Sequence, residues 1–113
     1  METFYKISSY LLFILGVIHT LMTRVFYQPF SIDALWFAGT GLGLVFLGLL
    51  NITSLKIYMS SVYNITIFAN ILFTLYSVFV VIVLPEPQAF IVILLIICAL
   101  IGSITIRMQC QKK

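Results

Sequence analysis

Four long apolar stretches constrain this sequence more than any other feature. They run about 7–26, 34–52, 62–84 and 88–106. A helix needs about 20 apolar residues to cross the hydrocarbon core of a bilayer, and backbone groups in lipid must be paired within the segment. The stretches also lack the alternation expected of a β-barrel. The sequence therefore predicts an all-α bundle of four transmembrane helices, up-down-up-down, as a single domain over 1–113.

The composition supports a membrane protein. The chain is 63% hydrophobic and only 8% charged, whereas soluble domains carry about 25% charged residues. The four spans leave no room for a soluble module. Membrane lipids are the ordinary partners of the few basic residues, and no nucleic-acid binding is expected.

The basic residues are distributed unevenly between the two sides. With four spans, a single side receives Lys6, Lys56, Arg107, Lys112 and Lys113, and the other receives Arg24. Positively charged residues favour the cytoplasmic side of a membrane. The pattern predicts a protein of the bacterial cytoplasmic (inner) membrane with both termini in the cytoplasm.

The second stretch is rich in glycine. Gly39 and Gly43 form a G-x-x-x-G pair, and Gly41 and Gly48 lie nearby. Small residues let helices in lipid approach closely. The pair therefore indicates packing within the bundle or, alternatively, a homo-oligomer interface.

The third stretch carries a polar stripe. Tyr63, Thr66, Asn70, Thr74 and Ser77 recur at spacings of three and four, which places them on one face of a helix. Lipid cannot satisfy such groups, so the stripe should face the interior. It provides either interhelical hydrogen bonds, at about 0.6 kcal/mol each, or the lining of a ligand cavity.

His19 is the only histidine, and it lies within the first stretch. An ionisable residue inside a membrane span suggests a function. We consider a neutral His19 that is hydrogen-bonded to the polar stripe, and haem held by two His19 side chains in a dimer. One histidine and two cysteines without a C-x-x-C motif predict no metal site.

Polar residues also lie near the non-cytoplasmic ends of the spans. Arg24 is expected to form an ion pair with Asp33 or Glu86; the alternative is a cationic mouth for an anionic ligand. Ser31 or Asp33 could cap the second helix. Trp36, one turn further on, suits an interfacial anchor.

Two segments carry a family resemblance. The first is Leu15-Gly16-Val17-Ile18-His19, and the second is the glycine-rich AGTGLGL at 38–44. Together with the short loop between them, they resemble DoxX-like four-helix membrane proteins. The resemblance implies a compact bundle, sometimes an accessory subunit of a respiratory or redox complex. The acidic residue that often follows the glycines in that family is absent here.

No catalytic motif is present, which favours a non-enzymatic function. We expect a lipid-like or apolar small molecule, or a membrane partner, to bind in a cavity between the first three helices. The candidate ligand-binding residues are His19, Trp36, Thr66, Asn70 and Thr74. The alternatives are an accessory or anchor subunit of a membrane redox complex, with haem at His19, and a small dimeric transporter.

Overall fold

The computed structural model describes residues 2–26 and 31–111, with side chains up to Gln109. It contains four helices: α1 (Glu2–Phe26), α2 (Ile32–Lys56), α3 (Ser60–Val83) and α4 (Pro87–Gln111). All four are long and apolar enough to cross a membrane. The predicted all-α four-helix fold is confirmed, and the chain is a small integral membrane protein. The basic residues at 112 and 113 lie outside the described part.

The helices extend beyond the predicted apolar stretches. α1 begins at Glu2 instead of residue 7, and α4 continues to Gln111 instead of ending near 106. Hydropathy marks only the part of a helix that suits lipid, whereas backbone hydrogen bonding continues through polar residues at its ends. At the start of α2, the Ser31 hydroxyl accepts a hydrogen bond from the Ala34 backbone nitrogen at 3.2 Å. Ser31 is therefore the predicted N-cap.

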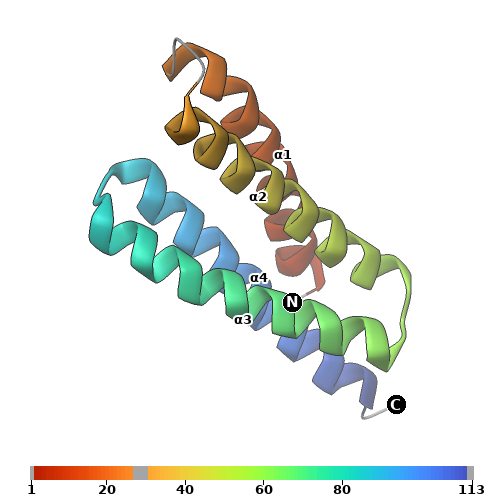
Figure 1. Cartoon of the computed structure of the whole chain (residues 1–113). Helices are drawn as coiled ribbons and strands as arrows, with labels where there is room; N and C mark the ends of the chain where they lie inside the picture. The colour runs from red at the N-terminus through yellow and green to blue at the C-terminus, as the bar shows by residue number, and fades with distance from the viewer. Residues whose placement is uncertain (1, 27–30, 112–113) are drawn as a thin grey trace.

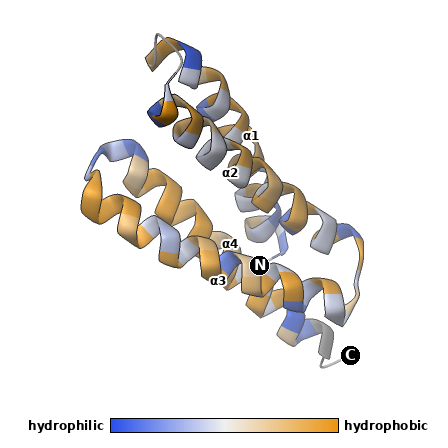
Figure 2. Ribbon diagram, viewed as in Figure 1, coloured by the Kyte–Doolittle hydropathy of each residue, from blue (hydrophilic) through white to orange (hydrophobic). Residues whose placement is uncertain are grey.

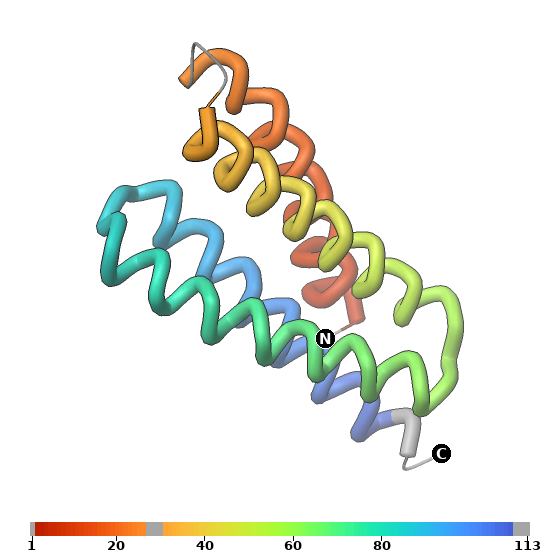
Figure 3. Tube along the Cα trace, in the orientation of Figure 1, coloured from red at the N-terminus to blue at the C-terminus, as the bar shows by residue number. Residues whose placement is uncertain are grey.

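The helices form two antiparallel hairpins, α1–α2 and α3–α4, which lie against each other in an elongated bundle (Figures 1 and 3). Its extents are 54 × 24 × 21 Å. The start of α1, the α2–α3 connection and the end of α4 lie toward one end, which we call the termini end. Hydrophobic residues cover most of the helix surfaces, and hydrophilic residues gather mainly near the helix ends (Figure 2).

Glycines bring α1 and α2 into close contact. A Cβ atom at Gly48 would lie 2.7 Å from the Phe13 backbone nitrogen, and one at Gly41 would lie 2.8 Å from the Thr20 backbone nitrogen. Gly16 makes a similar approach to the α2 backbone. Because only glycine permits such contacts, these three residues determine how closely the hairpin packs.

Gly39 and Gly43 have different surroundings within the bundle. Gly43 faces α3, where a Cβ atom would lie 2.8 Å from the Phe73 ring. Gly39 is exposed, and a Cβ atom there would meet nothing within 4 Å among the described residues. Packing within the bundle is thus confirmed for Gly43, while a homo-oligomer interface through Gly39/Gly43 stays a prediction.

The hydrophobic core draws on all four helices. Tyr5 is fully buried, and its ring lies against Gly102, which places α1 beside α4. The other buried core residues are Leu12, Leu44, Leu47, Tyr63, Ile96, Ala99 and Ile106. The core therefore joins the two hairpins.

Candidate functional site

Two asparagines pair inside the bundle. Asn51 of α2 and Asn70 of α3 are both fully buried. The Asn51 Nδ2 donates to Asn70 Oδ1 at 3.0 Å, and the Asn70 Nδ2 donates to Asn51 Oδ1 at 2.9 Å. This reciprocal amide pair joins the two hairpins.

The amide pair reaches the other two helices as well. The Tyr5 hydroxyl of α1 donates to Asn51 Oδ1 at 2.7 Å, and Asn70 Nδ2 donates to Ser103 Oγ of α4 at 3.3 Å. We call Tyr5, Asn51, Asn70 and Ser103 the four-helix network. One connected set of buried hydrogen bonds therefore joins all four helices.

The hydrogen-bonding capacity of this network is nearly used up. Asn51 Nδ2 also donates to the Leu47 carbonyl at 2.8 Å, so both donor and both acceptor positions of the Asn51 amide are occupied. Asn70 uses both of its donors and one acceptor position. A satisfied buried network stabilises a single packing arrangement. The polar stripe on α3 faces the interior as predicted, and Asn70 serves helix packing there.

Asn51 and Tyr5 were not predicted from the sequence as site residues. Asn51 lies near the end of the apolar stretch in α2, and Tyr5 precedes the stretch in α1, so hydropathy placed both near the membrane surface. The predicted up-down topology contained the information needed to find Asn51. Because consecutive helices are antiparallel, the end of α2 lies beside the start of α3. A polar residue late in helix 2 then has partners in the stripe of helix 3.

His19 lies far from this network. It is fourteen residues beyond Tyr5 on α1, or about 21 Å along the helix. Its ring stacks on Phe37 of α2 with a centroid distance of 3.9 Å. Its Nε2 and the hydroxyl of Thr23, one turn further on, are buried without a hydrogen-bond partner among the described residues. His19 Nε2 therefore makes no hydrogen bond to the α3 stripe within the described residues, and a functional role for His19 stays a prediction.

The other candidate ligand-binding residues are also scattered. Trp36 is 74% exposed on the surface of α2, as expected of an interfacial anchor. The buried Thr66 hydroxyl contacts the Ser54 hydroxyl of α2. The half-buried Thr74 donates to the Asn70 carbonyl of its own helix at 2.7 Å. The five candidates therefore do not surround one cavity, although a ligand-binding role for each individually stays a prediction.

Arg24, Asp33 and Glu86 are exposed, and their ion pairing stays a prediction. Haem at His19 likewise stays a prediction. Axial ligation uses an accessible imidazole nitrogen, whereas Nε2 is covered and the ring is stacked. In this ring orientation Nε2 is therefore not placed to bind haem. Within 2–26 and 31–109, no group of three or more His, Cys, Asp or Glu side chains could hold a metal ion.

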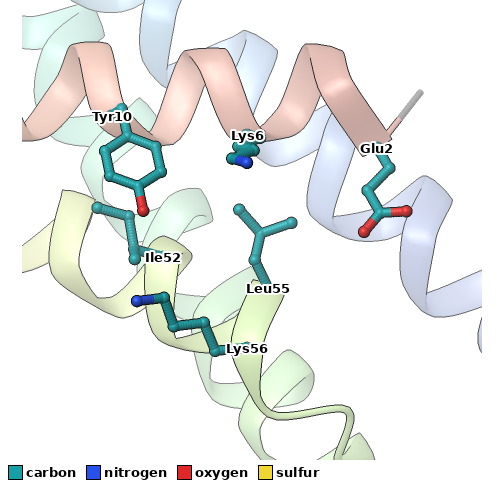
Figure 4. Close-up of a pocket in the computed structure, with 6 residues that line it drawn as sticks. All are labelled: Glu2, Lys6, Tyr10, Ile52, Leu55 and Lys56. Carbon is teal, nitrogen blue, oxygen red and sulfur yellow. The ribbon is translucent and has the colours of Figure 1, made fainter.

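A pocket of about 170 Å³ opens between α1 and α2 at the termini end. We call it the α1–α2 pocket, and Figure 4 shows its lining. Glu2, Lys6 and Tyr10 lie along one side on α1; Ile52, Leu55 and Lys56 lie along the other on α2.

The lining combines charged and apolar groups. The Lys56 amine and the Tyr10 hydroxyl lie toward one end of the pocket, and the Glu2 carboxylate lies toward the other, with Lys6 between them (Figure 4). A hydroxyl from the α2–α3 connection, that of Tyr58, donates to Glu2 Oε1 at 3.2 Å. From the sequence, Lys6 and Lys56 indicated only which side of the membrane is cytoplasmic. The up-down arrangement was enough to place them at the same end of the bundle.

No protein-family model, curated protein or solved structure matches the chain. The resemblance to DoxX-like proteins, and the redox role it implies, therefore stay predictions.

Proposed function

We propose that this protein is a non-enzymatic membrane protein that binds a lipid-like amphiphile in the α1–α2 pocket, with both termini in the cytoplasm. A single observation carries the proposal: two lysines and two aliphatic side chains line one pocket at a helix end. This combination suits a molecule with an anionic group and an apolar chain.

The chemistry of the lining supports an amphiphile. Lys6 and Lys56 belong to different helices and both line the pocket, so they offer an anion two ammonium groups from opposite sides. Lysine binds phosphate as a point charge. Ile52 and Leu55 form an apolar wall between the charged groups. An acyl chain leaving the pocket would meet the apolar outer surface of the helices, which include the exposed Ile7 and Leu11 of α1.

The orientation follows from the same residues. Lys6 and Lys56 lie at the termini end, together with Arg107 in the last turns of α4. Juxtamembrane basic residues favour the cytoplasmic side and are attracted to its anionic lipids. The pocket would then lie at the cytoplasmic leaflet, where its lysines can contact anionic headgroups.

Native mass spectrometry of protein released in gentle detergent tests the proposal. We expect the wild type to retain phospholipid, and the Lys6→Gln/Lys56→Gln double variant to retain at least several-fold less. Arg24→Gln is the matched control, because it removes one positive charge at the opposite end of α1. Equal lipid retention by the double variant and the wild type would contradict the proposal.

A further inference from the structure

We infer that the amphiphile is an aminophospholipid, with its phosphate between Lys6 and Lys56 and its ammonium group against Glu2. This inference rests on the proposed function and specifies its ligand. It derives from the order of charges along the α1–α2 pocket: the Glu2 carboxylate lies at one end, and the lysines occupy the middle and the other end.

The lysines account for the phosphate. A phosphodiester carries one negative charge and accepts hydrogen bonds from several directions, which suits two ammonium groups on facing helices. The Tyr10 hydroxyl lies toward the same end of the pocket as the Lys56 amine and adds a neutral donor (Figure 4). All three groups favour a phosphate, but none of them distinguishes one phospholipid from another.

Glu2 distinguishes an aminophospholipid from other phospholipids. A carboxylate in a site for a plain anion would repel it, yet Glu2 lines the same pocket as both lysines. The Tyr58 hydroxyl donates to one of its oxygens at 3.2 Å, which holds the carboxylate at the pocket and leaves acceptor capacity on the group. An ammonium group next to a phosphate satisfies both signs of charge at once.

The headgroup of an aminophospholipid carries its two charges close together. In phosphoethanolamine, two carbon atoms separate the ammonium nitrogen from the phosphate ester oxygen, so both charges fit within one small pocket. Glu2 and Lys6 are four residues apart on α1 and therefore share one face of the helix. The ligand would give each of these two neighbours a contact of opposite charge.

The test uses purified full-length protein in detergent, titrated with dioleoylphosphatidylethanolamine and separately with dioleoylphosphatidylglycerol. The two lipids have identical acyl chains and differ only in their headgroups. Native mass spectrometry gives the bound fraction of each, and their ratio is the headgroup preference. The variants are Glu2→Gln, the Lys6→Gln/Lys56→Gln double variant, and Glu86→Gln, which makes the same chemical change at the other end of the bundle. Circular dichroism checks that each variant remains helical.

The wild type should prefer the ethanolamine lipid. Glu2→Gln should lower that preference about two- to fivefold, since an exposed charge pair is a modest contribution, and Glu86→Gln should leave it unchanged. If Glu2→Gln keeps the wild-type preference for the ethanolamine lipid, the ammonium contact with Glu2 is overturned, and the proposed lipid binding at the lysines is not. The proposed function fails separately, if the double lysine variant binds both lipids as the wild type does.

Discussion

Replacing Asn70 by leucine should destabilise the bundle, although leucine suits a membrane interior. The side chain makes three interhelical hydrogen bonds, two with Asn51 and one with Ser103. Interhelical hydrogen bonds in membranes contribute about 0.6 kcal/mol each on average, so losing three costs about 2 kcal/mol. The substitution also leaves amide positions of Asn51 unpaired in an apolar interior.

Unfolding by titration with sodium dodecyl sulphate, followed by circular dichroism, measures this change. Asn64→Leu is the matched control, because Asn64 has the same side chain on the same helix but is exposed. We expect its unfolding free energy to stay within about 0.5 kcal/mol of the wild type. If Asn70→Leu were as stable as the wild type, the four-helix network would not hold the bundle together.

A double-mutant cycle isolates the amide pair itself. Once Asn51 is leucine, Asn70→Leu can no longer remove the two bonds that join the asparagines. The second substitution should then cost about 1 kcal/mol less than it does in the wild type, because two bonds of about 0.6 kcal/mol are already lost. Additive effects would show that the two residues stabilise the protein independently.

Three further predictions follow from the packing and the charge pattern. Gly48→Ala should lower the unfolding free energy by about 1–3 kcal/mol, because its Cβ would lie 2.7 Å from the Phe13 backbone nitrogen. Gly39→Ala should instead raise the unfolding free energy by up to about 1 kcal/mol in the monomer. If Gly48→Ala were the more stable of the two variants in the same titration, this packing would be refuted. His19→Leu should change the unfolding free energy by less than about 1 kcal/mol, because removing an unpaired buried nitrogen offsets the lost ring stacking. A decrease of more than about 2 kcal/mol would contradict this expectation. Reporters fused at the C-terminus should be active only if they function in the cytoplasm; activity of a periplasmic reporter there would exclude the proposed orientation.

The fold and the interior face of α3 were predictable because each rests on local information. Segment length and hydropathy identify helices that suit a membrane. A spacing of three and four residues places Thr66, Asn70 and Ser77 on one helical face, and all three are buried. Neither conclusion requires knowing which helix lies next to which.

The glycine contacts were harder to assign. Gly39 and Gly41 differ by two residues, or about 200° around a helix, so they lie on nearly opposite faces of α2. The pairs Gly39/Gly43 and Gly41/Gly48 both offer a surface of small residues. The structure directs Gly41 and Gly48 toward α1. That choice depends on the rotation of α2 about its own axis, which tertiary packing determines and local sequence does not show.

The two polar sites also differ in how far their groups are satisfied. In the four-helix network, Asn51 has every donor and acceptor position occupied, so the network holds helices and offers little to a ligand. The α1–α2 pocket has open volume beside Lys6 and Lys56. Tyr5 and Asn51 belong to the same two helix ends as this pocket, and their hydrogen bond at 2.7 Å joins those ends. The buried network therefore joins the two helices that line the pocket, and the proposed ligand would bind in the open volume beside the lysines and not at the satisfied Asn70.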